Sequence, residues 1–244
     1  MNNTMALYLL VPLAPLVGAL IAGLFGKVIG RAWSHRVTIL LVGVSFLASL
    51  KIFMGVQDGE TFNGTVYQWM TSDGVSFEVG FLIDRLTVLM MLVVTFVSLM
   101  VHIYTIGYME EDPGYQRFFS YISLFTFSML MLVMANNFVQ LFFGWEAVGL
   151  VSYLLIGFWY TRDTAIYANL KAFLVNRVGD FGFLLGIGLV LYAFGSLDYA
   201  TVFAAAESHA SELAPVPGVS WNLITVICVL LFIGAMGKSA QFPL

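Results

Sequence analysis

A single acidic residue, Glu146, stands in the middle of an otherwise apolar stretch that covers residues 137–160. A helix of that length crosses the hydrocarbon core of a bilayer. An ionised carboxylate near the bilayer centre costs roughly 2.5 kcal/mol or more, so it normally faces a protein interior or a wet cavity and has a partner. We interpret Glu146 as a residue that exchanges a proton. The alternative is a structural carboxylate bonded to a neighbouring helix.

Lys238 is the second candidate, and it lies where Gly237 and Pro243 predict a broken helix. Freed backbone groups at such a break can hold water or ions. A buried lysine beside a carboxylate such as Glu146 can store a proton. Seventeen residues separate Trp221 from Lys238, which is about 25 Å of straight helix. That spacing places Lys238 near the inner membrane surface, where a lysine side chain would simply reach out to water.

Three more ionisable side chains fall within the apolar stretch 166–194. Arg177 and Asp180 are three residues apart, so they share a helix face and can pair near mid-membrane. The alternative for this pair is an ion pair that only fixes helix packing. Lys171 belongs either to an inner polar path or to the membrane surface. Candidate groups lining a proton path are Ser152, Tyr153 and Ser239.

The remaining polar and aromatic residues carry weaker signals. We expect His102 to be a satisfied histidine close to the inner interface, and Asp84 with Arg85 to form an interfacial pair at the outer edge. The single cysteine, Cys228, supports no disulfide framework, thiolate metal site or redox pair. We expect the tryptophans to serve as interfacial and packing residues: Trp69, Trp145, Trp159 and Trp221.

Apolar helices must position these residues. Of the 244 residues, 60% are hydrophobic and 10% are charged, whereas soluble domains carry about 25% charged residues. We predict an all-α, polytopic transmembrane helical bundle in one domain, residues 1–244, with the last span incomplete. Because an apolar segment rarely ends a chain, we expect these residues to be the N-terminal part of a longer protein. The seven predicted spans are 5–26, 37–56, 86–109, 118–135, 137–160, 166–194 and one that starts near 221. A very tight turn around Asn136 predicts that the fourth and fifth spans pack antiparallel.

The charges of the loops predict the orientation. Loops 57–78 and 196–220 contain no Lys or Arg. The other loops carry the basic residues Lys27, Arg31, Arg36, Arg117 and Arg162. The positive-inside rule therefore places the basic loops in the cytoplasm and the N-terminus outside. Strand-forming residues on both sides of an Asp-Gly turn at 73–74 predict a small outer-face β-hairpin over 65–78.

Four long segments resemble the antiporter-like membrane subunits of proton-translocating NADH:quinone oxidoreductase, respiratory complex I. They are YTIGYMEEDPGYQRFFSYISLF (104–125), GWEAVGLVSYLLIGFWY (144–160), NRVGDFGFLLGI (176–187) and GAMGKSAQFPL (234–244). The resemblance covers nearly all of the chain. The second segment is more similar to the subunit L family than to the sister subunits M and N or to Mrp-type cation/proton antiporters.

The resemblance implies a role for each main candidate. The family's fifth-helix glutamate corresponds to Glu146, its lysine on the broken seventh helix to Lys238, and its polar pair to Arg177 and Asp180. It also implies that Lys238 lies in the membrane interior. Such subunits contain two inverted five-helix repeats that each form a half-channel. The first repeat would begin near residue 116 and be truncated in this chain.

The resemblance also implies the wider setting. The chain would be a membrane subunit of the oxidoreductase, a translocase, in which quinone reduction elsewhere drives proton pumping through a buried Glu/Lys relay. No cofactor is expected on this chain, because NADH, FMN, Fe–S clusters and quinone would be bound by partner subunits. The partners would be other complex I membrane subunits, especially subunit M, and the lipid bilayer. The small net charge of −4 suggests no nucleic-acid partner. The location would be a bacterial inner (plasma) membrane, or the mitochondrial inner membrane.

Two other functions remain open at the level of sequence. The chain could be the A-type subunit of an Mrp-like sodium/proton antiporter. It could also be a structural membrane scaffold whose buried charges only lock helix packing. In the proton-pumping hypothesis, Lys238 holds a proton while Glu146 stabilises it, and movement of charge in a neighbouring subunit weakens that pair.

Overall fold

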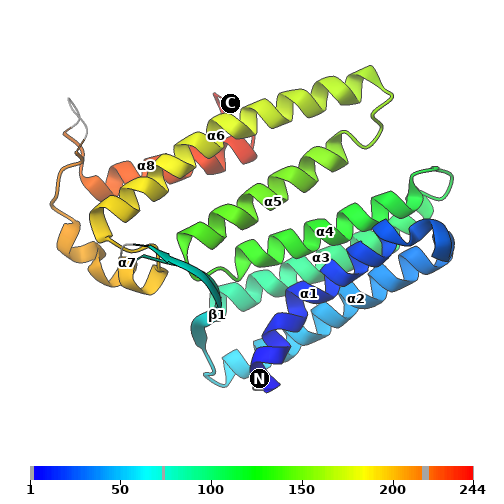
Figure 1. Ribbon diagram of the computed structural model, residues 1–244, viewed down its shortest axis with the longest axis horizontal. Helices are drawn as coiled ribbons and strands as arrows, with labels where there is room; N and C mark the ends of the chain where they lie inside the picture. The colour runs from blue at the N-terminus through cyan, green and yellow to red at the C-terminus, as the bar shows by residue number, and fades with distance from the viewer. Residues whose placement is uncertain (1–2, 73–74, 216–219, 244) are drawn as a thin grey trace.

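The computed structural model describes residues 3–72, 75–215 and 220–243 (Figure 1). The described chain is mostly helical, with two strands after the second helix and a short 3₁₀ helix, Ala206–His209, after the seventh. The helices are α1 (Asn3–Leu24), α2 (Gly26–Gln57), α3 (Arg85–Tyr108), α4 (Tyr115–Val133), α5 (Phe138–Ile156), α6 (Asp163–Phe194), α7 (Tyr199–Ala205) and α8 (Leu223–Lys238). The strands are β1 (Phe62–Ser72) and β2 (Val75–Ile83).

Six helices in the described ranges, α1 to α6, are long and apolar enough to cross a membrane. The seventh predicted span is the shorter apolar helix α8, which has 16 residues. The prediction of a polytopic, all-α membrane protein with a small sheet is therefore confirmed. Each predicted span corresponds to one helix, although α2 begins well before residue 37 and continues through a kink at Gly30.

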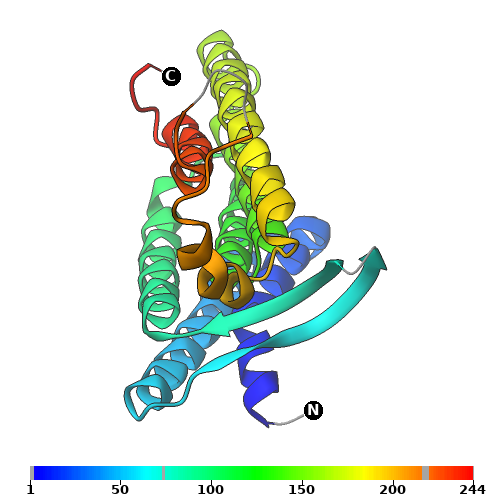
Figure 2. The ribbon, with the colours of Figure 1, turned by 90° about the vertical axis from the view of Figure 1, so that its left-hand side faces the viewer.

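The helices form two groups that meet at α5. Helices α1 to α4 pack side by side, and α5 runs antiparallel to α4 after the turn around Asn136, as predicted (Figures 1 and 2). Helix α8 lies along α6 on the other side of α5 (Figure 1). The site described below lies where α5 meets this α6–α8 pair.

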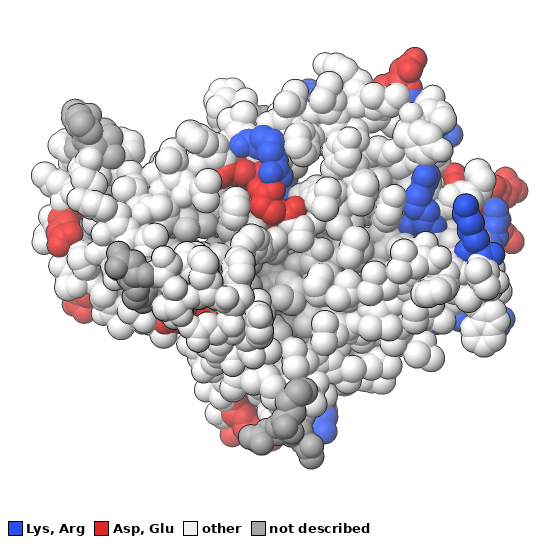
Figure 3. Space-filling model, in the orientation of Figure 1, with Lys and Arg blue, Asp and Glu red and all other residues white. Residues whose placement is uncertain are grey.

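The connecting segments separate by charge. The α1–α2, α3–α4 and α5–α6 connections lie together at one end of the bundle (Figure 1). Basic side chains gather at that end in Figure 3. The hairpin and α7 lie toward the opposite end, on the side of the N-terminus (Figure 1). The predicted grouping of the basic loops on one side of the bundle is therefore confirmed.

The hairpin is longer than predicted. Strands β1 and β2 pair antiparallel from Phe62 opposite Ile83 to Ser72 opposite Val75, with two irregularities in register. The extension occurs because Phe81 and Ile83 are fully buried and pack with residues of α4 such as Leu130. The Asp-Gly turn at 73–74 lies outside the described residues.

The segment between α6 and α8 contains an element that the sequence analysis missed. Helix α7 begins after Asp198, whose side chain accepts a hydrogen bond from the Thr201 amide at 2.9 Å. Such a bond satisfies a free amide of the first helical turn. The sequence analysis treated residues 196–220 as a loop, although the spacing of Asp198 from Thr201 is typical of a helix start.

One further expectation was wrong. Asp84 does not form an ion pair with Arg85 in the part of the chain that the structure describes; its carboxylate accepts from the Thr87 amide at 2.8 Å and caps α3. His102 is fully buried between α3 and α4, and its closeness to the inner interface stays a prediction. Its Nδ1 atom lies 2.7 Å from the carbonyl oxygen of Ser98, because the side chain turns back along its own helix.

The start of α5 is anchored at several points. Asn137 caps the helix by accepting from the Gln140 amide at 2.8 Å, and the Phe138 amide donates to the Leu197 carbonyl. The Gln140 side chain accepts from the Gly80 amide of β2 at 2.8 Å. The hairpin and the outer loop therefore fix the end of the helix that carries Glu146.

Candidate functional site

Glu146 lies near the middle of α5, about 12 Å from the start of the helix and about 15 Å from its end. Asp180 lies in the middle part of α6, about 21 Å from its end at Phe194. In Figure 3 a group of acidic and basic side chains appears near the middle of the visible face, apart from the charges at the two ends. Such a position is where ionised groups require partners.

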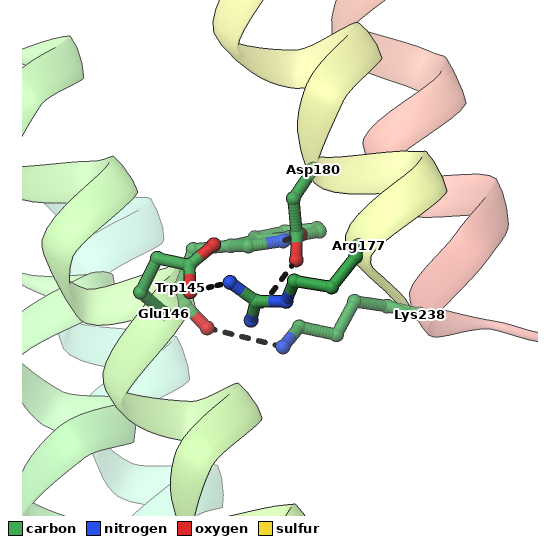
Figure 4. A network of polar contacts seen from close by, with 5 residues as sticks. All are labelled: Trp145, Glu146, Arg177, Asp180 and Lys238. Atoms are coloured by element: carbon green, nitrogen blue, oxygen red, sulfur yellow. Dashed lines mark hydrogen bonds and ion pairs between the residues drawn. The ribbon is translucent and has the colours of Figure 1, made fainter. Parts of the chain in front are cut away.

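Arg177 joins the two acidic residues. Its Nη1 atom lies 2.5 Å from Glu146 Oε2, and its Nη2 atom lies 3.2 Å from Asp180 Oδ2 (Figure 4). The second contact is the pair that the three-residue spacing predicted. The first connects α6 to α5 and was not predicted, because helical spacing describes one helix at a time.

Lys238 reaches the same site from the end of α8. Its Nζ atom donates a hydrogen bond to the Trp145 carbonyl oxygen at 3.0 Å and lies 5.4 Å from the centre of the Trp145 ring (Figure 4). Within the described residues, no direct ion pair joins Lys238 to Glu146. The two side chains point into one site, and the backbone of Trp145, the residue next to Glu146, lies between them.

Close packing of α6 on α8 sets the level of Lys238. A Cβ atom added at Gly179 would lie 3.2 Å from the Cα atom of Gly237, so the two helices nearly touch there. Asp180 and Lys238 directly follow these glycines and therefore lie at the same level. Lys238 lies at the level of Asp180 because α8 runs along α6 and ends there, while the depth of Lys238 in the membrane stays a prediction.

Gly149 provides the space for the ammonium group. It lies one turn after Glu146 on α5, and a Cβ atom there would be only 2.8 Å from Lys238 Nζ. The structure shows that the group approaching this position is the Lys238 side chain.

Trp145 is the residue of this site that the sequence analysis missed. Its indole Nε1 donates to Asp180 Oδ1 at 2.8 Å. A tryptophan in an apolar run is typical of packing, and for that reason it drew no functional interpretation. A usable signal was present, because an indole N–H at mid-membrane requires a hydrogen-bond acceptor.

We call Glu146, Arg177, Asp180 and Lys238 the charge cluster. When all four are ionised, its two negative and two positive charges cancel. The Asp180 side chain is 6% exposed, while Glu146 and Arg177 are 26% and 38% exposed. Glu146 Oε1 is buried and has no hydrogen-bond partner among the described residues. The arrangement can therefore hold charge at mid-helix and offers a free carboxylate oxygen that can accept a proton.

The other predicted path residues do not join the charge cluster. Lys171 is exposed on α6, and Ser239 is exposed just after α8. Ser152 is half-buried on α5, and Tyr153 packs against Phe173 with ring centres 5.5 Å apart. Among the described contacts, none of the four side chains makes a hydrogen bond or ion pair with the cluster. Their part in a proton path therefore stays a prediction.

Two segments match described families. Residues 69–119 match "NADH-Ubiquinone oxidoreductase (complex I), chain 5 N-terminus", and residues 135–244 match "NADH:quinone oxidoreductase/Mrp antiporter, TM". NADH-quinone oxidoreductase subunit L of Neisseria meningitidis serogroup B is 66% identical, over 99% of this chain and 37% of that protein. The chain belongs to the antiporter-like subunit family of complex I. NADH-ubiquinone oxidoreductase chain 5 of Triticum aestivum is 48% identical over 98% of this chain and 36% of its own length.

Solved structures share the antiporter-like fold. A chain of the Mrp complex from Dietzia sp. matches with a TM-score of 0.77 and 24% identity, over 97% of this chain and 24% of that chain. A chain of the archaeal membrane-bound sulfane sulfur reductase matches with a TM-score of 0.76 and 19% identity, over 96% and 34%. The present chain spans about a third of the length of the curated relatives it matches.

Proposed function

We propose that this chain is part of a proton-translocating membrane subunit of NADH:quinone oxidoreductase, and that the charge cluster carries the proton. The observation that supports this most is the meeting of two acids and two bases from three helices near mid-span. Membrane proteins concentrate ionisable groups at such depth where ions or protons move. The relatives named as subunit L and chain 5 support the same function.

The charge balance of the cluster suggests how it works. Four charges that sum to zero are tolerated in an environment of low polarity, whereas a single unbalanced charge raises the free energy of the protein there. Gain or loss of one proton leaves the cluster with one net charge. Its protonation therefore responds strongly to charges in neighbouring protein. In this mechanism Lys238 holds the proton, the negative charges of Glu146 and Asp180 stabilise it, and charge movement nearby releases it.

The wider assembly follows from the same proposal. The partners are other membrane subunits of the oxidoreductase, with subunit M as the neighbour, while NADH, FMN, Fe–S clusters and quinone are bound by partner subunits. The membrane is a bacterial inner membrane, or the mitochondrial inner membrane, with the basic loops on the cytoplasmic or matrix side and the N-terminus outside. The first inverted repeat begins near residue 116 and continues in the longer protein.

Sodium/proton exchange as an Mrp-type A subunit is the second candidate. The description of the family matched by residues 135–244 names Mrp antiporters together with the quinone oxidoreductase. Proteoliposomes distinguish the two functions, because an antiporter exchanges sodium for protons without NADH. Sodium-dependent exchange by the full-length protein alone would favour this candidate.

The replacement Glu146→Gln in the full-length protein tests the proposal. Glutamine keeps the shape of the side chain but removes its charge and its ability to exchange a proton. We expect the assembled complex to oxidise NADH but to pump fewer protons per NADH into proteoliposomes. Glu207→Gln is the matched control, because Glu207 is exposed in the outer loop and makes no side-chain contact among the described residues. Unchanged pumping per NADH in the Glu146 variant would end the proposal.

A further inference from the structure

Trp145 contacts the acidic and the basic parts of the charge cluster at once. Its indole N–H donates to the Asp180 carboxylate at 2.8 Å, and its carbonyl oxygen accepts from Lys238 at 3.0 Å. Figure 4 shows the Trp145 ring beside Asp180 and the Lys238 side chain reaching the same group of residues. Within the described residues Asp180 and Lys238 have no direct ion pair, so Trp145 is the physical connection between them.

The orientation of the indole is fixed by packing. Its ring stacks on Phe183 of α6, with ring centres 4.8 Å apart and an angle of 14° between the planes. Phe142, one turn earlier on α5, lies against the other end of this stack, with its ring centre 6.2 Å from that of Phe183. A ring held in this way keeps its N–H directed at Asp180. Its face lies 5.4 Å from Lys238 Nζ, within the range of a cation–π contact.

We propose that Trp145 is a positioning residue of the proton relay, which holds Asp180 and Lys238 in one geometry. The inference rests on the proposed function of the charge cluster. Trp145 itself exchanges no proton, because the indole nitrogen is only a donor. It acts through its neighbours, since a carboxylate that keeps its hydrogen bond stays in place beside Arg177. An ammonium held by a carbonyl and a ring face stays at the level of that carboxylate.

The replacement Trp145→Phe separates the hydrogen bond from the packing. Phenylalanine retains an aromatic ring for the stack with Phe183 and leaves the backbone carbonyl in place, but it cannot donate to Asp180. We expect protons pumped per NADH by the assembled complex to fall about tenfold, the scale of one lost hydrogen bond to a charged group. We also expect the midpoint of pumping as a function of pH to move, because the relay has lost a hydrogen bond to one of its charged groups.

Trp159→Phe is the matched control. The Trp159 indole also donates to an aspartate, Asp112, at 2.8 Å, but this pair lies at the α3–α4 loop, away from the charge cluster. We expect its pumping ratio and its pH midpoint to equal those of the wild type. A purely structural loss of packing at Trp145 would lower pumping equally at every pH without moving the midpoint, and that result would overturn the inference.

Glu146→Gln is measured beside these variants so that two failures can be told apart. If Glu146→Gln loses pumping while Trp145→Phe behaves like Trp159→Phe, the role of Trp145 is wrong and the proposed function stands. If Glu146→Gln pumps like the wild type, the proposed function fails and the inference fails with it. If Trp145→Phe does not assemble, Phe183→Leu tests the inference instead, because it removes the ring that stacks on the indole but keeps the indole N–H. A fall in pumping per NADH that is smaller than the tenfold expected for Trp145→Phe supports the inference, and wild-type pumping overturns it.

Discussion

Gly149 is the position where the smallest change of side chain tests the geometry of the charge cluster. A Cβ atom there would lie 2.8 Å from Lys238 Nζ and 3.5 Å from Arg177 Nη2. The first distance is too short for two atoms that are not bonded. Gly149→Ala must therefore displace the ammonium group, which can move because it is the end of a flexible side chain.

The size of the displacement gives the size of the effect. An ordinary contact of about 3.5 Å requires the Lys238 Nζ atom to move by about 0.7 Å. A shift of that size directed away from α5 lengthens its bond to the Trp145 carbonyl from 3.0 Å to about 3.7 Å, which is no longer a hydrogen bond. Loss of a hydrogen bond to a charged group costs about 1.5–3 kcal/mol. The bonded position of Lys238 should then be roughly 10- to 150-fold less populated.

The assay is proton pumping per NADH by the assembled complex in proteoliposomes. We expect Gly149→Ala to lose most of its pumping while thermal stability is kept, because alanine is favoured over glycine within a helix by about 1 kcal/mol. Gly188→Ala on α6 is the control, since a Cβ atom there meets no atom within 4 Å. Wild-type pumping by an assembled Gly149→Ala variant would show that the position of Lys238 does not matter for the function.

Two predictions concern the elements that hold the site in place. Asn137→Ala removes the cap of α5 and should lower stability by about 1 kcal/mol; a thermal midpoint equal to that of the wild type would contradict this role. Burial raises the pKa of Asp112 in the α3–α4 loop, but hydrogen bonds from Trp159 and Gly114 and two nearby arginines outweigh it and hold that pKa below its usual value. A carboxylate with a depressed folded-state pKa stabilises the fold above its unfolded value of about 3.9, and the effect is lost as pH falls through the folded-state value. Amide-exchange protection factors of residues 109–114 should therefore drop below about pH 4, and constant protection from pH 6 to pH 3 would refute this.

Features that depend on one helix at a time were predictable from the sequence. The isolated carboxylate Glu146 predicted a polar partner for the middle of α5, and the spacing of Arg177 and Asp180 predicted their pair. The broken segment around Lys238 predicted the end of α8 at that residue. In each case the relevant distance lies within one or two helical turns, which the helix period fixes.

Features that depend on how helices pack against each other were not predictable from periodicity. The Arg177–Glu146 contact joins α5 to α6, and the level of Lys238 depends on the approach of Gly179 to Gly237. Small residues permit such close crossings, but many glycines in membrane helices make none. The structure places Lys238 at the level of Asp180, and the position in the membrane interior that the family resemblance implies stays a prediction.

Trp145 shows a different limit. Aromatic residues in apolar runs mostly pack, and its sequence position does not reveal which way the indole points. The structure shows where it points, because α6 places Asp180 opposite the N–H and Phe183 against the ring. The same limit applies to the short helix α7, because the sequence alone does not show that the Asp198 carboxylate caps a helix rather than lying in a loop.

The central claim is that an acid on α5 and an amine at the end of α8 share the work of carrying a proton. The most direct measurement is the number of protons pumped per NADH by the complex in which Glu146→Gln and Lys238→Gln are combined. Because the double replacement leaves the net charge of the cluster at zero, it removes the exchangeable protons with little change in electrostatic balance. The account predicts an assembled complex that oxidises NADH with a clearly lower pumping ratio. A ratio equal to that of the wild type would show that the buried charges only hold the helices together.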